Sequence, residues 1–314
     1  MGASNRPRSA VAVFAALILV LLTSASRAAD IPMIDAHSQV DNGVSMEKVL
    51  SLMNEAGISR AILSALHGGS KTREIVAAAA LRPDRITPSI GLKNRGFREG
   101  NPAAIERLHR LGAEPNFGAI SEVMVLHQQK GKRAPEIIVD LDSLQVREAL
   151  AVAQKRRWPL VIHIEFGFAA ETGRYRSYME ALERFLARHP DHPMALTHMG
   201  QLKPAEARRL IESHPNIYFL TSHANTVFIR DRGSGLPWTN LFDGKALATE
   251  WRKLFVRHPD RFVLAFDNVY DDDWSYHYVH QAQLWKTALE DLPADVANAV
   301  AHRNAERLWH LPPL

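Results

Sequence analysis

The sequence predicts an α/β fold, and within that class a single (β/α)8 barrel of the TIM type. Short apolar segments alternate with amphipathic helical segments from Pro32 to the end of the chain. Neighbouring parallel strands need a crossover, usually a helix, so this alternation is typical of parallel sheet units. The length of 314 residues also suits one barrel, whose usual size is about 250 residues.

The predicted strands are short, and helical segments separate them. Asp142–Lys155 and Ser177–Arg188 are two such helices, because their apolar side chains fall largely on one side. Asp142 or Ser143 is expected to cap the first turn of the earlier helix. The eight strands are expected at Met33–His37, Ala61–Ser64, Ile86–Gly91, Gly118–Val123, Leu160–His163, Met194–His198, Ile217–Ser222 and Phe262–Asp267.

One turn motif recurs between a helical segment and a strand. Proline ends the helix and Asp or Asn turns the chain, so each copy predicts the same helix-to-strand connection. Its histidines are therefore expected on the surface at helix ends rather than in a catalytic site. A different stretch, Leu126–Asp140, is irregular and is expected to be a loop on the active face. The four copies of the turn are Arg82–Arg85, His189–His192, His214–Ile217 and His258–Arg261.

The first residues predict export. Arg6 and Arg8 precede the apolar run Ala10–Leu22, and the small residues Ser26 and Ala28 follow it. This order is typical of a secretory signal peptide. We expect residues 1–28 to be removed, residues 29–314 to form the barrel, and the protein to lie in the periplasm. The rival interpretation is an uncleaved membrane anchor, which needs about 20 apolar residues. The run Ala10–Leu22 is shorter than that, so no stable membrane anchor is expected after cleavage.

The composition excludes several kinds of site and partner. The chain has no cysteine, so disulfides, thiolate metal sites and cysteine nucleophiles are excluded, and a large core must hold the fold. The net charge of +4 comes mostly from arginines of the predicted signal peptide. Without a basic stripe interleaved with aromatic residues, nothing predicts nucleic-acid binding. The expected partner is a small-molecule substrate, and a homo-oligomer is left open.

Histidines and carboxylates stand at the ends of several predicted strands, where barrel proteins carry their functional groups. Residues two apart on a strand share a face, so His37 and Gln39 are both expected to point inward. Imidazole nitrogen and carboxylate oxygen suit a divalent metal ion. Glu165 and His223 stand at similar positions, but a structural role is expected for them. The candidate metal ligands are His37, Gln39, Glu122, His163, His198 and Asp267.

Structural alternatives apply to these candidates too. A single strand-end histidine is more often a hydrogen-bonded structural residue than a ligand. Asp267 follows a strongly apolar strand, and a lone carboxylate there would be costly to bury without a cation or donor. Glu122 could instead pair with Lys93 or Arg95, which follow the third strand.

The pattern resembles the amidohydrolase superfamily, specifically its amidohydrolase-related branch of metal-dependent hydrolases and decarboxylases. The resemblance runs from Met33–His37 to the closing Asn304–Leu308. Members open with Asp-x-His-x-His, place a histidine after the fifth and the sixth strand, and place an aspartate after the eighth. The resemblance implies one divalent ion, zinc or manganese. The matching positions here are His37, His163, His198 and Asp267.

One position departs from that pattern. Gln39 stands where the second histidine of the opening pair is expected. Its amide oxygen is a weaker ligand than imidazole, and its amide group can serve as a hydrogen bonder. Three hypotheses follow. The ion is held by His37, His163 and Asp267 with Gln39 as a poor or indirect ligand; the site favours a harder ion such as Mn²⁺; or the metal has been lost.

The resemblance implies hydrolysis of an ester, lactone or amide bond in a small substrate by a metal-activated water. Asp267 would take the proton, and His198 would orient the water or stabilise the oxyanion. One alternative is a metal-dependent decarboxylase acting on an acidic ring compound. The other is a metal-free barrel that binds a ligand in the same mouth.

Substrate selection is expected in the loops. Basic side chains there could clamp a substrate carboxylate, although a solvated surface role is also open for each. Trp274 is a candidate pocket wall, whereas Asp271–Asp273 are expected to cap the last helix. The basic candidates are Lys93, Arg95 and Arg98 after the third strand, and Arg174 and Arg176 after the fifth.

Overall fold

The computed structural model describes residues 1–2, 31–132 and 134–314. Pro32–Leu314 forms one compact unit, and residues 1–31 are a separate unit. The predicted signal peptide therefore lies almost entirely outside the described residues. Among the residues that are described, no helix is long and apolar enough to cross a membrane.

Parallel strands form the barrel, and a strand overlaps each predicted strand segment. One ladder runs β1-β2-β3-β4 and the other runs β12-β9-β8-β7-β5, with the short strand β6 (Ile137–Ile138) antiparallel on its edge. The barrel strands are β1 (Met33–Val40), β2 (Ile58–Ala65), β3 (Ile86–Ile90), β4 (Ala119–Ile120), β5 (Val123–His127), β7 (Leu160–Ile164), β8 (Met194–Leu196), β9 (Ile217–Leu220) and β12 (Phe262–Val263).

The fourth predicted strand, Gly118–Val123, is broken in the structure. Its first half is β4, which pairs with β3, and its second half begins β5, which pairs with β7. Ser121 and Glu122 occupy the break. The backbone N–H of Ser121 still donates to the carbonyl oxygen of Ile90 in β3, at 2.9 Å. The chain itself therefore joins the two ladders, and it does so at Glu122.

The other junction closes the barrel between its first and last strands. The predicted eighth strand, Phe262–Asp267, is regular only in β12, but its remainder still bonds to β1. Ala36 N–H donates to Leu264 O at 3.0 Å, and Asp267 N–H donates to His37 O at 2.7 Å. The last strand thus ends directly beside the first, which brings Asp267 next to His37.

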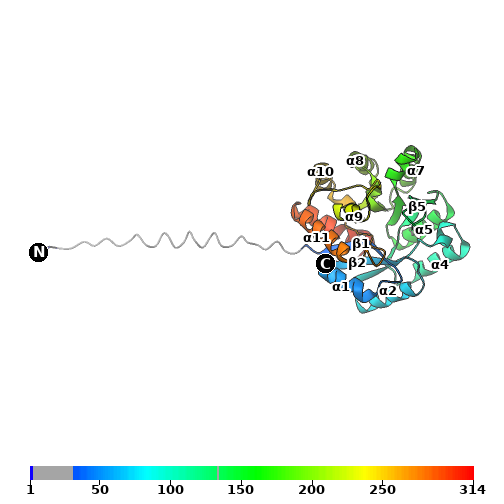
Figure 1. The fold of residues 1–314 in the computed structure, drawn as a ribbon, viewed down its shortest axis with the longest axis horizontal. Helices are drawn as coiled ribbons and strands as arrows, with labels where there is room; N and C mark the ends of the chain where they lie inside the picture. Colours follow the sequence, from blue (N-terminus) through cyan, green and yellow to red (C-terminus); the bar gives the residue numbers. More distant parts are fainter. Residues whose placement is uncertain (3–30, 133) are drawn as a thin grey trace. The chain divides into compact units, whose positions relative to one another are not determined.

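The amphipathic helices surround the strands in chain order (Figure 1). The predicted helices Asp142–Lys155 and Ser177–Arg188 are α5 and α7. Ser143 stands at the N-cap of α5, but its side chain makes no capping hydrogen bond. The outer helices are α1 (Met46–Ala56), α2 (Ser70–Leu81), α4 (Pro102–Ala113), α5 (Leu144–Arg156), α7 (Tyr175–Arg188), α8 (Pro204–Ser213), α10 (Thr249–Arg257) and α11 (Tyr276–Glu290).

Shorter elements follow the strand ends or close the chain. The last helix, α13, packs beneath the barrel. Its residues Leu308 and Trp309 belong to a core cluster with Ile34, Val161 and Val263. These elements are α3 (Arg95–Arg98), α6 (Phe166–Glu171), η1 (Thr197–Gln201), α9 (Thr226–Asp231), the hairpin β10 (Phe242–Asp243) and β11 (Ala246–Leu247), η2 (Pro259–Arg261), α12 (Ala294–Asn298), η3 (Ala299–Arg303) and α13 (Asn304–Trp309).

The recurrent turn motif connects helices to strands, as predicted. Its first residue is the C-cap of α2, α7, α8 and α10, and β3, β8, β9 and β12 follow. The prediction that its histidines lie on the surface is wrong for His192, which is buried. Burial, with a smaller effect of His189, lowers the pKa of His192 to about 4.

Asp35 fastens the junction that closes the barrel. Its fully buried carboxylate accepts hydrogen bonds from the backbone N–H of His37 at 3.2 Å and of Phe266 at 3.1 Å. The hydroxyls of Ser38 and Tyr278 donate to it at 2.6 and 3.3 Å. One acceptor thus satisfies donors from β1, the last strand and α11. Burial raises the pKa of Asp35, and the donors only partly oppose this effect.

We predict that Asp35→Ala lowers the free energy of unfolding by roughly 3–5 kcal/mol, because it leaves two buried backbone N–H groups without an acceptor. Tyr278→Phe removes a single donor and is expected to cost about 1 kcal/mol. Chemical denaturation of both variants measures the difference. Equal losses in the two variants would show that Asp35 does not hold the junction.

Candidate metal centre

A cavity of about 730 Å³ opens at the carboxyl ends of the barrel strands. This volume suits a small-molecule ligand. Three of the predicted metal ligands, His163, His198 and Asp267, line it. His37 and Glu122 are buried and contact these lining residues, so the predicted residues do converge on one place.

His37 faces two carboxylates. Its Nε2 atom lies 3.4 Å from Asp267 Oδ1 and 3.5 Å from Glu122 Oε1. This buried nitrogen has no hydrogen-bond partner among the described residues. Burial lowers the pKa of His37, but the charges of Asp267 and Glu122 raise it by more. His37 Nε2 therefore faces the negative charge of two buried carboxylates.

Gln39 shares the inward face of β1 with His37, as predicted, but it is a donor. Its Nε2 donates to Asp267 Oδ1 at 2.8 Å and to Glu122 Oε1 at 3.3 Å. Both neighbours are acceptors, and this assigns the amide nitrogen to the side that faces them. Gln39 therefore acts here as a hydrogen-bond donor to the two carboxylates, which is one of the roles left open for it from the sequence.

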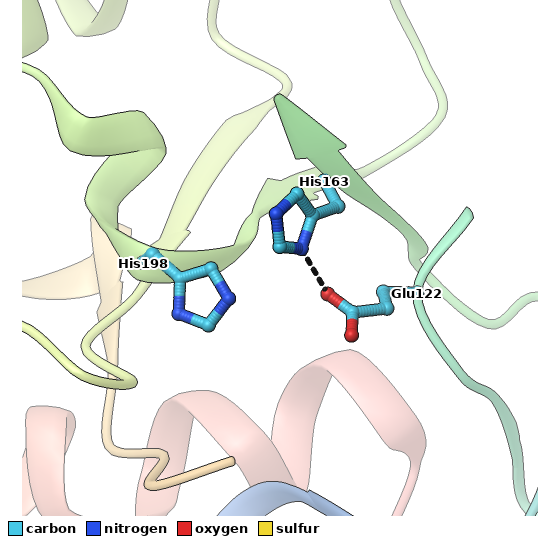
Figure 2. A group of neighbouring side chains, drawn as sticks. All are labelled: Glu122, His163 and His198. Atoms are coloured by element: carbon cyan, nitrogen blue, oxygen red, sulfur yellow. Dashed lines mark hydrogen bonds and ion pairs between the residues drawn. The ribbon is translucent and has the colours of Figure 1, made fainter. Parts of the chain in front are cut away.

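Glu122 is shared between two sides of the site. Its Oε2 accepts from His163 Nδ1 at 2.7 Å, and Figure 2 shows these two groups pointing toward one another with the His198 ring beside them. Its Oε1 forms an ion pair with Lys93, one of the two pairings considered from the sequence. Burial raises the pKa of Glu122, but Lys93 and His163 lower it well below the usual value. Glu122 is therefore ionised at neutral pH.

Glu165 binds the other ring nitrogen of His163. It accepts from His163 Nε2 at 3.0 Å and from the backbone N–H of Gln128 at 2.7 Å, and it forms an ion pair with Lys130. His163 thus lies between the carboxylates of Glu122 and Glu165. Burial lowers the pKa of His163, but these two carboxylates raise it by more. The ring is held in a fixed orientation by bonds at both nitrogens.

His198 presents a lone pair to Asp267. Its Nδ1 lies 3.2 Å from the carbonyl oxygen of Ser222, which can only accept, so we place the proton on Nδ1. Nε2 then faces Asp267 Oδ2 at 3.5 Å. Burial and the nearby His223 and His163 lower the pKa of His198 well below the usual value, so the ring is neutral.

His223 also belongs to the site, although only a structural role was expected. Its ring stacks on Phe228 at 3.6 Å and on His198 at 4.5 Å between centroids. Its Nε2 lies 3.1 Å from the carbonyl oxygen of Asp267 and 3.9 Å from Oδ2. Burial lowers the pKa of His223 to about 4, which keeps the ring neutral at pH 7.

Three of these residues have a left-handed backbone, which non-glycine residues rarely adopt. The φ angles are 54° for His198, 59° for His223 and 56° for Asp267. Each such residue costs of order 1–3 kcal/mol and persists only where the surroundings enforce it. Residues of this kind cluster at functional sites, which supports a functional role for this end of the barrel.

The donor atoms fit a divalent cation. Within each group the atoms lie within 4.8 Å of one another, and nitrogen and oxygen donors are mixed as borderline metal ions prefer. The unpartnered His37 Nε2 and the lone pair of His198 both face carboxylate oxygens. The groups around the centre are His37–Glu122–Asp267, Glu122–His163–His198 and His198–His223–Asp267.

The predicted substrate-binding residues are scattered. Lys93 and Arg95 line the cavity, but Arg95 is mostly exposed and pairs with Glu99. Arg174 lies outside the cavity lining, 3.5 Å from Glu136. The prediction that Trp274 forms a pocket wall is wrong, because its indole is fully buried and donates to the backbone oxygen of Gln39 at 2.7 Å.

The predicted cap of the last long helix is also corrected. Ser275, not the preceding aspartates, stands at the N-cap of α11 and accepts from His277 N–H. Asp271 pairs with Lys48 and Asp272 pairs with Arg232. Arg176 is almost fully exposed and pairs with Glu180, which is the solvated role left open for it. Of these charged residues, Asp272 and its partner Arg232 line the cavity, whereas Asp271 and Arg176 do not.

His127 and Trp238 are among the cavity residues that the sequence analysis missed. His127 ends β5 and lines the cavity, and burial lowers its pKa to about 3. The apolar run Val123–Leu126 could have extended the predicted fourth strand to it. Trp238 has no such signal, because it lies in the loop before β10, and its ring contacts His198 at 5.2 Å and His223 at 5.3 Å between centroids.

Solved structures share this fold at low sequence identity. The 2,6-dihydroxybenzoate decarboxylase from Rhizobium matches with 14% identity and a TM-score of 0.57, covering 89% of this chain and 99% of that chain. A zinc-bound amidohydrolase from Burkholderia multivorans matches with 14% identity and a TM-score of 0.53, covering 90% and 100%. The 4-oxalomesaconate hydratase from Rhodopseudomonas palustris matches with 12% identity and a TM-score of 0.54, covering 89% and 96%. At these identities the likeness shows the fold alone.

Sequence comparison identifies the family. A search of curated proteins finds no match to this sequence. The family model described as "Amidohydrolase" matches residues 22–311, which is most of the chain. The barrel with its strand-end histidines and aspartate is therefore that of a member of the amidohydrolase family.

Proposed function

We propose that this protein is a metal-dependent hydrolase that cleaves an ester, lactone or amide bond in a small substrate. The observation that carries the proposal is the convergence of histidine and carboxylate donors from different strand ends on one cavity. Family membership supports an enzyme of this superfamily, while the hydrolytic reaction is our own inference.

One zinc or manganese ion would be held by His37, Glu122 and Asp267, whose donor atoms form one group. A bound divalent ion supplies a Lewis acid that polarises a carbonyl group and acidifies water. All of these donors are buried, so charge interactions within the site are only weakly screened.

Asp267 is the group we assign to proton transfer. Gln39 fixes its Oδ1, whereas its Oδ2 faces the two neutral histidines His198 and His223 and the cavity. Oδ2 can therefore accept a proton from the attacking water and return it to the leaving group. His198, held by Ser222, would orient the water or the substrate oxygen.

The substrate is expected to carry a carboxylate. Lys130 and Arg98 line the cavity, and the Nε of Arg98 has no hydrogen-bond partner in the described part of the chain. A guanidinium group suits a carboxylate because it donates in a planar fork. Trp238 contacts His198 and His223, lies beneath the Lys130 ammonium and supplies an apolar wall.

We predict that protein purified without chelator contains a divalent ion and hydrolyses members of a panel of carboxylated lactones, esters and amides. Asp267→Asn is expected to lower kcat by about 10²–10⁴-fold, as for loss of a general base. Elemental analysis and product assays measure both. Release of CO₂ instead of an acid and a leaving group would identify a decarboxylase, and absence of both metal and turnover would contradict the proposal.

Trp238 offers a separate test of the cavity wall. Trp238→Ala is expected to raise KM about tenfold, because the substrate loses an apolar contact, while metal content stays unchanged. Trp238→Phe keeps an aromatic ring and serves as the matched control. Steady-state kinetics on the best substrate of the panel measures the effect, and equal KM values for the two variants would remove Trp238 from the binding site.

We also propose that the protein is exported and processed after Ala28, on the sequence argument given above. N-terminal sequencing of protein from the periplasmic fraction is then expected to begin at Ala29. Ala28→Leu places a large residue at the cleavage position, so the precursor should accumulate. A mature protein that retains residues 1–28 would contradict this proposal.

A further inference from the structure

We infer that Lys93 is a built-in cation of this centre, which a divalent ion must displace from Glu122 in order to bind. The inference rests on the proposed metal-dependent function. It concerns how tightly this particular chain holds its ion and which of its residues sets that affinity.

Lys93 and the ion would use the same oxygen. The Lys93 ammonium pairs with Glu122 Oε1, and the same Oε1 faces His37 Nε2 at 3.5 Å within the group His37–Glu122–Asp267. The Lys93 side chain is 19% exposed and Glu122 is fully buried. Both positive charges therefore cannot approach this oxygen without repelling one another.

The surroundings bind the ammonium group strongly. Burial lowers the pKa of Lys93, but the charges of Asp267 and Glu122 raise it by more, so the side chain is charged. The ammonium itself pairs with Glu122, one of the carboxylates that would ligate the ion. Neutralising buried carboxylates is what a metal ion would otherwise do here.

Gln39 completes the same arrangement. Its amide N–H groups donate to Glu122 Oε1 and to Asp267 Oδ1, the two oxygens that His37 faces. An ammonium and an amide donor thus satisfy the carboxylates where the family pattern expects a second histidine and an ion. Gln39 and Lys93 share one acceptor, Glu122 Oε1, so the residue that departs from the family pattern lies beside a compensating cation.

The test is a titration of metal-free protein with Zn²⁺ and with Mn²⁺, read by competition with a chromophoric chelator. Lys93→Met is expected to bind the ion at least tenfold more tightly than the wild type, because the competing charge is gone. Lys71→Met is the matched control, since Lys71 is also buried but contacts Val44 and Glu74 on α2. Its affinity should equal that of the wild type. An unchanged or weaker affinity in Lys93→Met overturns the inference.

A second variant guards against misfolding, because Lys93→Met leaves Glu122 without its ammonium. Lys93→Gln keeps a donor but no charge, and it should also gain affinity. In the wild type, saturating Zn²⁺ should release the Lys93 amine and increase its labelling by an amine-reactive reagent, read by peptide mass spectrometry. If the labelling of Lys93 does not change at saturating Zn²⁺, the inference is overturned. It is also overturned if neither the wild type nor the Lys93→Gln variant binds metal.

These outcomes separate the inference from the proposed function. A wild type that binds the ion tightly, with no gain in either Lys93 variant, removes the inference and leaves the hydrolase intact. If the Lys93 variants bind metal while the wild type stays metal-free and inactive, the inference is supported and the proposed metal-dependent function is contradicted.

Discussion

The negative charge of two buried carboxylates, Glu122 and Asp267, is the constraint on which the mouth of this barrel depends. Ionised groups removed from water cost several kcal/mol unless cations or donors compensate them. His37, Gln39 and Lys93 all gather on the oxygens of this pair. The polar cluster is therefore held together because positive and donor groups compensate the charge of the two carboxylates. A catalytic ion would enter a site in which Lys93 and Gln39 already compensate part of this negative charge.

The barrel places these groups by backbone geometry. The break between β4 and β5 puts Glu122 where two ladders meet, and the junction of the first and last strands puts Asp267 beside His37. The left-handed backbone of His198 and Asp267 turns their side chains toward this point. The strain at these residues is balanced by the closed sheet beneath them, which is why the functional groups stand on strand ends rather than on free loops.

The sequence predicted those parts of the structure that have local signals. Alternating apolar segments located the strands, and a polar residue after each apolar run located His163, His198 and Asp267. Other features depend on partners distant in the chain. Nothing near Trp274 indicates that its indole turns inward to Gln39, and nothing near Trp238 indicates that it covers two histidines. The orientation of Gln39 likewise follows from two carboxylates contributed by other strands.

The position of Asp35 has a consequence for how the chain folds. Its acceptor oxygens serve Phe266 and Tyr278, and β1 takes its closing partner from the segment after β12. The first strand therefore lacks half of its partners until nearly the whole polypeptide has been synthesised. Contacts that span such a separation form slowly, because a long loop must close first. Barrel closure is thus a late event in folding, because it waits for the residues that follow β12.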